Sequence, residues 1–370
     1  MKIVSGLLMN WFIITSTNCN LKCIYCQNES HPVLPIQPEW SIDQLKEFLS
    51  KDEEPIITFY GGEPLLNIKL IEEAMDKIQA KHFTLQTNGL LLKQLPTKYL
   101  HKFSSILVSL DGDRNVTDTN RGKGVYDRVL DNIQDIRNRG YDGDLIARMA
   151  VSEDSDIYND VLHLINSEEL TFDHVHWQID CQWDEGWDVR WKDFPGWVDK
   201  YNKGISKLVN FWFEEMKNGE VEGFVPFLGI FRHIINNTKT NLPCKAGLTS
   251  FAIRTDSEIT FCPLPPELDE EAVIGNLTSS SPQLVENAMK IRNPCPDCEV
   301  FDLCGGRCLF ANLYKLWGEE GFNMVCETVK HLVKELKQIE SEIRKLIGNG
   351  IISADDFDYP TYNNSTEIIP

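Results

Sequence analysis

The chain has 370 residues, 42% of them hydrophobic and 25% charged, which is typical of a globular protein with one large α/β domain and a smaller one. The 36 basic and 56 acidic residues give a formal charge of −20, which repels phosphate backbones and argues against nucleic acid as a partner. No apolar run reaches the roughly 18–20 residues of a membrane span, so we expect neither a membrane anchor nor a signal peptide.

Apolar, β-rich runs alternate with helical patterns over the first half of the chain. Strands are expected at residues 11–16, 56–60, 82–86, 106–110, 144–151 and 174–180. Amphipathic helices are expected between them, for example at residues 67–80 and 126–139. Six βα units in succession predict a parallel sheet with outer helices, which we interpret as an α/β fold of the partial, TIM-like (β/α)6 barrel type.

Four polar or glycine-containing motifs fall where the first four strands end. They are CNLKCIYC at residues 19–26, GGEP at 61–64, TNG at 87–89 and SLDG at 109–112. In barrels of parallel strands, reactive groups lie at the carboxyl ends of the strands. The four motifs are therefore predicted to meet at one site.

The first motif holds three cysteines, Cys19, Cys23 and Cys26, spaced C-x3-C-x2-C. A closed structural zinc site needs four protein ligands, and an ordinary iron–sulfur cluster is also held by four thiolates. A triplet therefore indicates a metal centre with one open position, where a substrate can bind.

The second half of the chain is rich in cysteine. A helix is expected at residues 198–217, then a linker with glycine and asparagine at 218–243, then seven cysteines, and then a helix at 327–346 with a surface-bound or mobile tail. Clustered cysteines without an export signal argue for metal binding in a reducing compartment, the cytoplasm, rather than for disulfides. The C-P-D-C run at residues 295–298 also fits a zinc knuckle, and thiolate spacing alone does not separate zinc from iron–sulfur.

These motifs carry a family resemblance. CNLKCIYC matches the C-x3-C-x-aromatic-C signature of the radical S-adenosylmethionine (SAM) superfamily, and GGEP and SLDG fall where that family's SAM-binding motifs fall. The later cysteines resemble the SPASM auxiliary-cluster domain, and the run GVYDRVL…IARMAVSEDSDIY…VHWQID is similar to an archaeal group of peptide-modifying members. The implied domains are a barrel (1–217), a linker (218–243), a SPASM domain (244–330) and a C-terminal helix and tail (331–370).

The resemblance implies how the first site works. Cys19, Cys23 and Cys26 would hold three irons of a [4Fe–4S] cluster, and the fourth iron would bind the amino and carboxylate groups of SAM. Reduction would then cleave SAM and give a 5′-deoxyadenosyl radical, while the protein supplies position and excludes water.

Further residues are expected to contact SAM. Tyr25 would meet adenine, unless it only packs the loop. Gly61 and Gly62 would let the backbone approach the ligand closely, and Glu63 would accept a hydrogen bond from the ammonium group of SAM.

Four polar residues complete the expected SAM site. Ser109 would reach the ribose and Asn88 would line the pocket. Arg121 or Arg148 would pair with the SAM carboxylate, although an arginine is more often a surface ion-pair partner.

The resemblance also divides the later cysteines between two auxiliary clusters. Auxiliary cluster II would be held by Cys295, Cys298, Cys304 and Cys326. Auxiliary cluster I would have only three ligands, Cys244, Cys262 and Cys308, which leaves an iron open or requires another ligand. Where the family usually has glycine, five residues before the second of these cysteines, this chain has Ser257, so the geometry of that hairpin turn is in question.

Two features concern the substrate. Six of the nine tryptophans lie between residues 177 and 212, and Trp183, Trp187 and Trp191 would share one helical face, either as a packed stripe or as an aromatic wall that holds a peptide. Asp180 and Cys181 follow the sixth strand, so Asp180 is a candidate proton acceptor, and Cys181 is a candidate site residue or a small buried hydrophobe.

The function expected from the resemblance is modification of a peptide or protein side chain by hydrogen abstraction, with flavodoxin or ferredoxin as an electron donor. The alternatives are a radical enzyme acting on a small molecule or cofactor precursor, and a non-catalytic metal-binding or electron-transfer protein. Only eighteen residues precede Cys19, so no N-terminal leader-recognition domain is expected.

Overall fold

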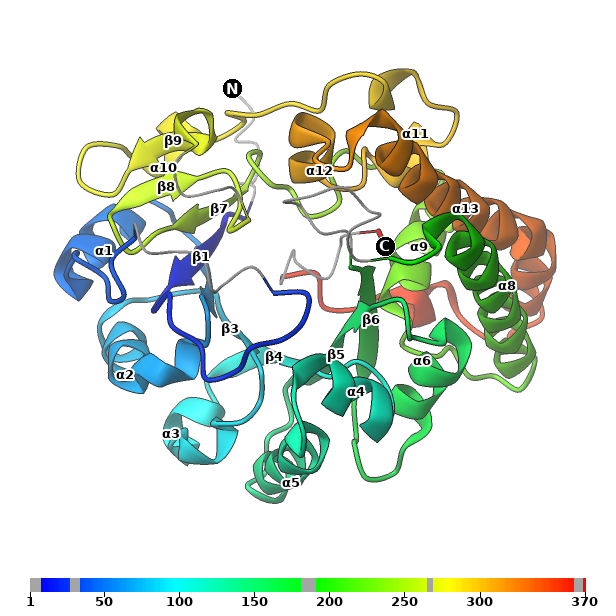
Figure 1. The fold of residues 1–370 in the computed structure, drawn as a ribbon, viewed down its shortest axis with the longest axis horizontal. Helices are drawn as coiled ribbons and strands as arrows, with labels where there is room; N and C mark the ends of the chain where they lie inside the picture. Colours follow the sequence, from blue (N-terminus) through cyan, green and yellow to red (C-terminus); the bar gives the residue numbers. More distant parts are fainter. Residues whose placement is uncertain (1–7, 27–33, 181–190, 265–268, 363–368) are drawn as a thin grey trace.

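The computed structural model describes residues 8–26, 34–180, 191–264, 269–362 and 369–370. One nine-stranded sheet runs through it in the order β6-β5-β4-β3-β2-β1-β7-β8-β9 (Figure 1). The first six strands are parallel: β1 (Asn10–Ile14), β2 (Ile56–Tyr60), β3 (His82–Thr87), β4 (Phe103–Ser109), β5 (Asp144–Val151) and β6 (His174–Ile179). The predicted parallel sheet is confirmed, with each strand within a few residues of its expected place.

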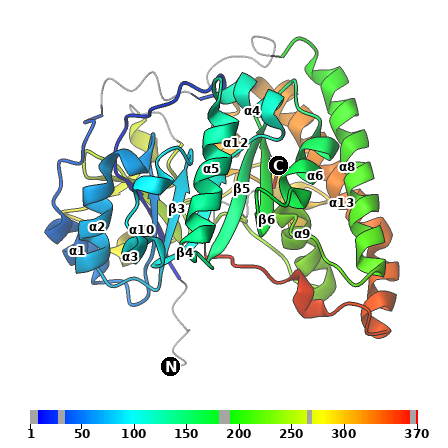
Figure 2. The same cartoon turned by 90° about the horizontal axis from the view of Figure 1, so that it is seen from below.

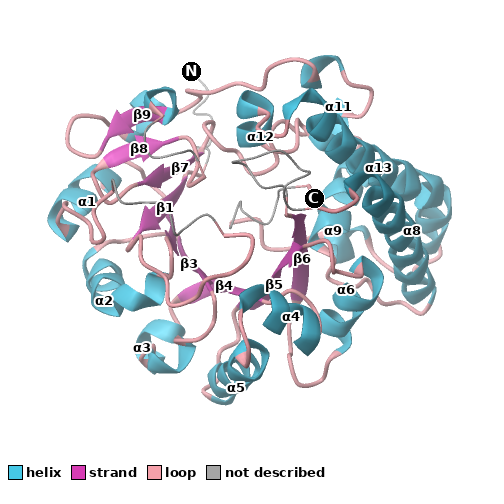
Figure 3. Ribbon diagram, in the orientation of Figure 1, coloured by secondary structure: helices cyan, strands magenta, loops and turns pink. Residues whose placement is uncertain are grey.

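The sheet curves into an open barrel with helices on its outer side (Figure 3). The helices that follow the strands are α1 (Ile42–Leu49), α2 (Ile68–Lys77), α3 (Thr97–Leu100), α4 (Arg114–Arg121), α5 (Val125–Asn138), α6 (Ile157–Asn166) and α8 (Phe194–Lys217). Outward side chains such as Trp11, Phe59 and Val108 are fully buried in the layer between sheet and helices. This apolar face drives the closure of the barrel wall.

The inner face of the barrel is polar at several positions. Asn10, Thr58 and Thr84 are fully buried there, and the Thr58 hydroxyl lies 2.8 Å from Asn10 Oδ1 and 2.7 Å from Thr84 Oγ1. Alternation of side chains along each strand places apolar residues outside and these polar residues inside. The barrel therefore has an interior suited to polar ligands.

Helix α8 begins four residues earlier than predicted. Asp193 caps it by accepting a hydrogen bond from Gly196 N at 2.9 Å, and Pro195 follows in the first turn, where its missing N–H is not needed. The prediction relied on apolar periodicity and overlooked this cap.

The strands that follow in sequence extend the same sheet. β7 (Ser250–Ile253) pairs in parallel with β1, and β8 (Glu258–Thr260) and β9 (Val273–Asn276) continue antiparallel beyond it. The segment predicted to be a linker carries α9 (Val225–Asn236), whose apolar side packs on β6 and on α13 (Gly318–Gly348). The domain limits proposed from the sequence remain a prediction.

Ser257 occupies the turn between β7 and β8 with a φ of 78°, so serine takes the left-handed conformation that glycine would adopt more easily. Ser257 N donates to Arg254 O at 3.2 Å, and Leu277 N donates to Ser257 O at 2.8 Å. Asp256 Oδ1 accepts from Glu258 N at 3.1 Å. The hairpin therefore forms despite the departure from glycine.

The last part of the chain packs on the barrel. It contains α10 (Pro282–Val285), α11 (Phe301–Cys304), α12 (Leu309–Tyr314) and the long α13, which lies along α8 (Figure 2). The described tail is bound rather than mobile, because Phe357 is fully buried against Trp212 and Phe231, and Tyr362 donates to Ser104 O at 2.9 Å. Among the described residues, no helix is long and apolar enough to cross a membrane.

Candidate active site and cysteine clusters

The GGEP motif forms the turn between β2 and the 3-10 helix Pro64–Asn67. Gly61 has a φ of 143°, and a side-chain carbon at this position would lie 2.3 Å from Ser16 O. Gly62 N donates to Ser16 O at 2.9 Å, and Glu63 N donates to Asn18 O at 2.8 Å. The turn therefore holds the segment that leads into Cys19, and only glycine fits its first position.

Glu63 is fully buried and joins the ends of β2 and β3. Its carboxylate accepts hydrogen bonds from Thr87 Oγ1 at 2.7 Å, Asn88 N at 2.8 Å and Leu65 N at 3.0 Å. Burial raises the pKa of Glu63 to about 7, although these hydrogen bonds oppose the shift. All three donors are protein groups, so Glu63 holds the loops that follow β2 and β3 in position relative to each other.

The three cysteines of the first motif lie on the loop after β1 as free thiols. Asn88 Nδ2 lies 3.7 Å from Cys19 Sγ and 2.7 Å from Asn20 Oδ1, so the TNG motif contacts the cysteine loop directly. Burial raises the pKa of the Cys23 thiol to about 11, and Arg121 opposes this shift. Accessible thiols near a cation and an amide donor are suited to hold an iron–sulfur cluster.

Asp111, from the SLDG motif, is fully buried and binds four groups from different parts of the chain. Arg121 donates from Nε at 3.0 Å and from Nη2 at 2.7 Å, and Tyr25 Oη donates at 2.7 Å. Asn120 Nδ2, at 3.2 Å, and Ala150 N, at 2.9 Å, complete the set. This carboxylate therefore connects the cysteine loop, α4 and β5.

Two of the residues expected to contact SAM lie within this network. The Arg121 guanidinium carbon also lies 5.4 Å from the centre of the Tyr25 ring. Arg121 is 7% exposed and has Asp111 as its protein counter-ion, so it does not match the surface ion pair considered from the sequence.

Arg148 points into the barrel from β5, opposite Ser109 of β4 in the strand register. Its Nη1 lies 2.6 Å from His176 Nδ1, and its Nη2 donates to Gln178 Oε1 at 2.5 Å. Burial lowers the pKa of Arg148 to about 10, and Tyr60 opposes this shift. Among the described residues no carboxylate forms an ion pair with Arg148.

Tyr60 is near cysteines of both groups. Burial raises its pKa to about 12, and Cys26 and Cys262 both contribute to the shift while Arg148 opposes it. The pKa of Tyr60, at the end of β2, thus depends on Cys26 of the first triplet, on Arg148 in the barrel and on Cys262 of the later set. The space above the barrel is bordered by both cysteine groups.

The residues considered for substrate contact are only partly described. Asp180 lies directly after β6 and donates through its backbone N to Val151 O at 2.9 Å, whereas Cys181, Trp183 and Trp187 lie outside the described residues. Trp191 is 2% exposed and packs on Phe194 and Trp197 at 4.9 and 4.6 Å. For Trp191 the peptide-wall hypothesis is wrong, because its ring belongs to the core.

Five of the later cysteines line one cavity of about 400 Å³ between α11, α12 and α13, and one of them, Cys308, is an expected ligand of auxiliary cluster I. The other four are the expected ligands of auxiliary cluster II: Cys295, Cys298, Cys304 and Cys326. Asn312 Nδ2 lies 3.4 Å from Cys295 Sγ. Burial raises the pKa of Cys304 to about 12. The cavity and these four thiols fit a cluster.

The other three later cysteines, Cys244, Cys262 and Cys308, lie around a small apolar cluster that includes Phe261 and Phe310. Burial raises the pKa of Cys244 to about 12, and Cys308 adds to the shift. Cys262 has its pKa raised by burial and by both partners. These three thiols are mutual neighbours, as expected for auxiliary cluster I.

The spacing of the thiols bears on the zinc alternative. In a tetrahedral zinc site with Zn–S bonds of about 2.3 Å, the sulfur atoms lie about 3.8 Å apart. In the described part of the chain, no three cysteine sulfurs lie within 4.8 Å of one another. These thiol groups are therefore more widely spaced than the ligands of a single zinc ion.

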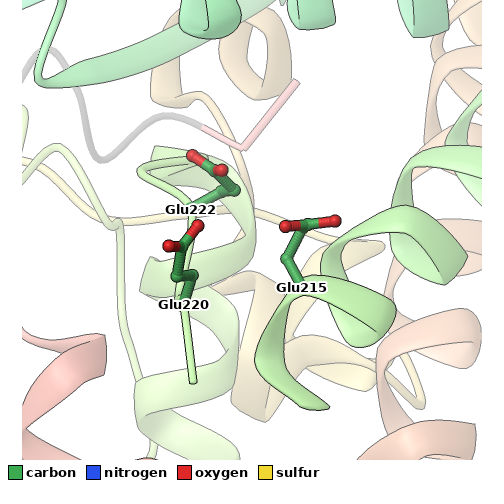
Figure 4. A group of neighbouring side chains, drawn as sticks. All are labelled: Glu215, Glu220 and Glu222. Atoms are coloured by element: carbon green, nitrogen blue, oxygen red, sulfur yellow. The ribbon is translucent and has the colours of Figure 1, made fainter. Parts of the chain in front are cut away.

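One other ligand-like group is present in the described segments. Glu215, at the end of α8, meets Glu220 and Glu222 of the next loop, and their carboxylates lie within 4.8 Å (Figure 4). Burial and the two neighbouring carboxylates raise the pKa of Glu222. Clustered acidic side chains near a surface turn do not by themselves make a site, and we assign none.

Sequence reasoning overlooked Asp111, Asn120 and Tyr60. Asp111 lies inside SLDG, which was interpreted only through Ser109. Its signal was a carboxylate at the end of a buried strand, ten residues before an arginine. The sequence does not show that Asn120 and Arg121 bind Asp111, because these residues meet it only where α4 folds back over the strand ends.

Comparisons with known proteins agree with this arrangement. A model of the Radical SAM superfamily matches residues 13–161. The cysteine-type anaerobic sulfatase-maturating enzyme of Clostridium perfringens is 21% identical, over 85% of this chain and 92% of the relative.

Solved structures share the fold. Native anSMEcpe with bound AdoMet and Cp18Cys peptide matches with a TM-score of 0.70 at 17% identity, covering 93% of this chain and 99% of that one. Streptococcus suis SuiB bound to precursor peptide SuiA matches with a TM-score of 0.57 at 15% identity, covering 82% and 72%. These findings show a Radical SAM domain at residues 13–161 and, together with the cysteine motifs, support a radical SAM enzyme with a SPASM-type extension, whose cofactors are SAM and [4Fe–4S] clusters.

Proposed function

We propose that this enzyme modifies a side chain of a peptide or protein by hydrogen abstraction. The observation that carries the proposal is Tyr60, at the end of β2, which is near enough to Cys26 of the first triplet and to Cys262 of the later set for both thiols to act on its pKa. A substrate above the barrel would then meet SAM on one side and the extension on the other. The bound peptides in the matched structures support a polypeptide as that substrate.

Bound SAM and its cluster would supply a 5′-deoxyadenosyl radical, and the protein's part is to hold and orient. Cys19, Cys23 and Cys26 would carry the cluster. Gly61 and Gly62 would let the backbone approach SAM. Glu63 would position the TNG loop through its bond to Asn88 N, and its role toward the SAM ammonium remains a proposal.

Of the two arginines, Arg148 is the better partner for the SAM carboxylate. Arg121 already has Asp111 as a buried counter-ion. The hydrogen-bond partners of Arg148 in the described chain are His176 and Gln178, and neither is a carboxylate. Ser109 lies beside Arg148 and would reach the ribose. Tyr25 has its hydroxyl on Asp111, which leaves a ring face for adenine.

The remaining assignments complete the reaction scheme. Asp180 would accept a proton if the product radical is oxidised, and Cys181 stays a candidate beside it. Auxiliary clusters would relay electrons or hold substrate. A flavodoxin or ferredoxin would donate the electron, and the many free thiols suit the reducing cytoplasm.

The proposal is tested in two stages with anaerobically reconstituted enzyme, SAM and dithionite. First, the enzyme should form 5′-deoxyadenosine and methionine, Cys23→Ala should abolish both, and Ile24→Ala should retain them. Ile24 is a matched control because its side chain is 55% exposed between two ligands.

In the second stage, deuterium-labelled peptide libraries are compared with labelled small metabolites. Deuterium should appear in 5′-deoxyadenosine only with a peptide. Transfer from small molecules alone would replace the peptide proposal by a small-molecule reaction. A Cys23→Ala enzyme as active as the parent would overturn the site itself.

A further inference from the structure

The cavity that holds Cys295, Cys298, Cys304 and Cys326 is also lined by a buried cation. Arg307 lies on the turn between α11 and α12 and is 6% exposed. Burial raises the pKa of the Cys326 thiol to about 11, and the strongest opposing influence is the charge of Arg307. The guanidinium is therefore near the thiols and shielded from water.

Arg307 has a left-handed backbone conformation, which costs conformational free energy. Gly305, Gly306 and Arg307 have φ values of 61°, 89° and 56°, three left-handed residues in succession. For a residue other than glycine this conformation costs about 1–2 kcal/mol. A side-chain carbon on Gly305 would lie 2.9 Å from Leu242 N, and one on Gly306 would lie 2.7 Å from Ile291. Position 307 is the one place on this turn with room for a side chain.

Trp317 contributes a second polar group to the same cavity. Its ring packs edge-on against Phe194 at 5.2 Å, and the residue is 9% exposed. Its Nε1 is buried and has no hydrogen-bond partner in the described parts of the chain. A buried N–H without an acceptor is costly, and cluster sulfur is an acceptor of the right kind.

We propose that Arg307 and Trp317 raise the reduction potential of auxiliary cluster II. This inference rests on the proposed ligand set Cys295, Cys298, Cys304 and Cys326. Reduction adds one electron and one negative charge to a cluster that four thiolates already make anionic. A cation and an N–H donor inside a low-dielectric cavity stabilise that added charge, and hydrogen bonds and charge at the sulfurs are known determinants of cluster potential.

The rim of the cavity offers a matched control. Lys330 also lines the cavity, but its side chain is 37% exposed and pairs with Glu327 at 3.2 Å. Solvent and this carboxylate screen its charge. Removing the charge of Lys330 should therefore change the potential much less than removing that of Arg307.

The experiment uses full-length protein with Cys19, Cys23 and Cys26 replaced by alanine, so that only the auxiliary clusters remain. Redox titration followed by electron paramagnetic resonance should resolve their reduction. Arg307→Gln should lower the equilibrium constant for reduction of one cluster about tenfold, a shift of about 59 mV for a one-electron couple. Arg307→Lys should restore most of it, and Trp317→Phe should give a smaller shift of the same sign.

Analysis of iron and sulfide distinguishes a wrong ligand assignment from a wrong role for Arg307 in setting the potential. Stoichiometric zinc without sulfide in the parent would overturn the ligand assignment. If iron and sulfide are retained in Arg307→Gln and the potential is unchanged, or moves no more than in Lys330→Gln, the tuning role is wrong. If Arg307→Gln does not load, Trp317→Phe decides the question, and an unchanged potential in that variant contradicts the proposal.

Discussion

The carboxylate of Asp111 and the guanidinium of Arg121 form a two-pronged ion pair that is almost completely removed from water. The contacts are 2.7 and 3.0 Å, and Asp111 also holds the hydroxyl of Tyr25 from the cysteine loop. Burial opposes the charged form of Arg121, but Asp111, Tyr25 and Cys23 together outweigh it and raise the pKa of Arg121. The pair fixes α4 and the cysteine loop to the end of β4.

Asp111→Asn should destabilise the apo-protein severely. It leaves Arg121 buried without a counter-ion, and breaking a buried pair from one side costs about 3–5 kcal/mol. Urea unfolding should report this loss. Asp113→Asn is the matched control two residues away, because asparagine caps α4 as well as aspartate does. Equal, small losses in both variants would show that the buried pair contributes little.

Gly61→Ala should be more harmful than Gly124→Ala. Both glycines have positive φ, 143° and 76°, so alanine is strained at each. Only at Gly61 does the added carbon meet a backbone oxygen, Ser16 O at 2.3 Å, whereas Gly124 faces open space. Gly124→Ala should cost about 1–2 kcal/mol, and Gly61→Ala should cost more and also weaken SAM binding, measured by calorimetry. Comparable effects at both sites would contradict the close-approach argument.

Glu63 should make the apo-protein less stable as pH rises from about 4.5 to about 7. The raised pKa, about 7 against an ordinary 4.5, means that the folded state binds more protons than the unfolded state in this window. The stability that Glu63 contributes is therefore complete below pH 4.5 and is lost by pH 7, a change of up to about 3 kcal/mol.

The measurement is the free energy of urea unfolding as a function of pH in the parent and in Glu63→Gln. Glutamine cannot titrate, so the decline assigned to Glu63 should disappear from the variant's profile. Comparison of slopes removes the constant cost of placing an amide among the donors Thr87, Leu65 and Asn88. Parallel profiles would mean that Glu63 titrates normally.

The later cysteines should hold iron without the first triplet. With Cys19, Cys23 and Cys26 replaced by alanine, reconstituted protein should retain iron and sulfide and the absorption band of [4Fe–4S] clusters. Adding Cys298→Ala should lower the iron content by about four per chain at most, because each cluster depends on its thiolates. Zinc in place of iron and sulfide would contradict the prediction that the later cysteines hold iron–sulfur clusters.

Much of the fold was predictable because local pattern and tertiary packing agree. The runs that became β2 and β5 coincide with their predicted residues 56–60 and 144–151, since parallel strands buried largely on both faces form nearly continuous, β-rich apolar runs. Helix α8 was placed too late because its cap at Asp193 precedes the apolar pattern. Trp191 shows that regular spacing alone can mislead. Its spacing from Trp183 and Trp187 suggested an exposed aromatic wall, but its side chain is buried in the core.

The sequence by itself determined the cysteine triplet, the GGEP and SLDG motifs and their order along the strands, because ligand type and spacing are properties of the chain. Only the tertiary structure decided which charges meet. Asp111 and Arg121 lie ten residues apart and Tyr25 lies 86 residues from Asp111, and their contact depends on how α4 folds over the strand ends. In the same way β7 joins β1, and Arg307 reaches Cys326, because burial of apolar faces brings together segments that no local pattern connects.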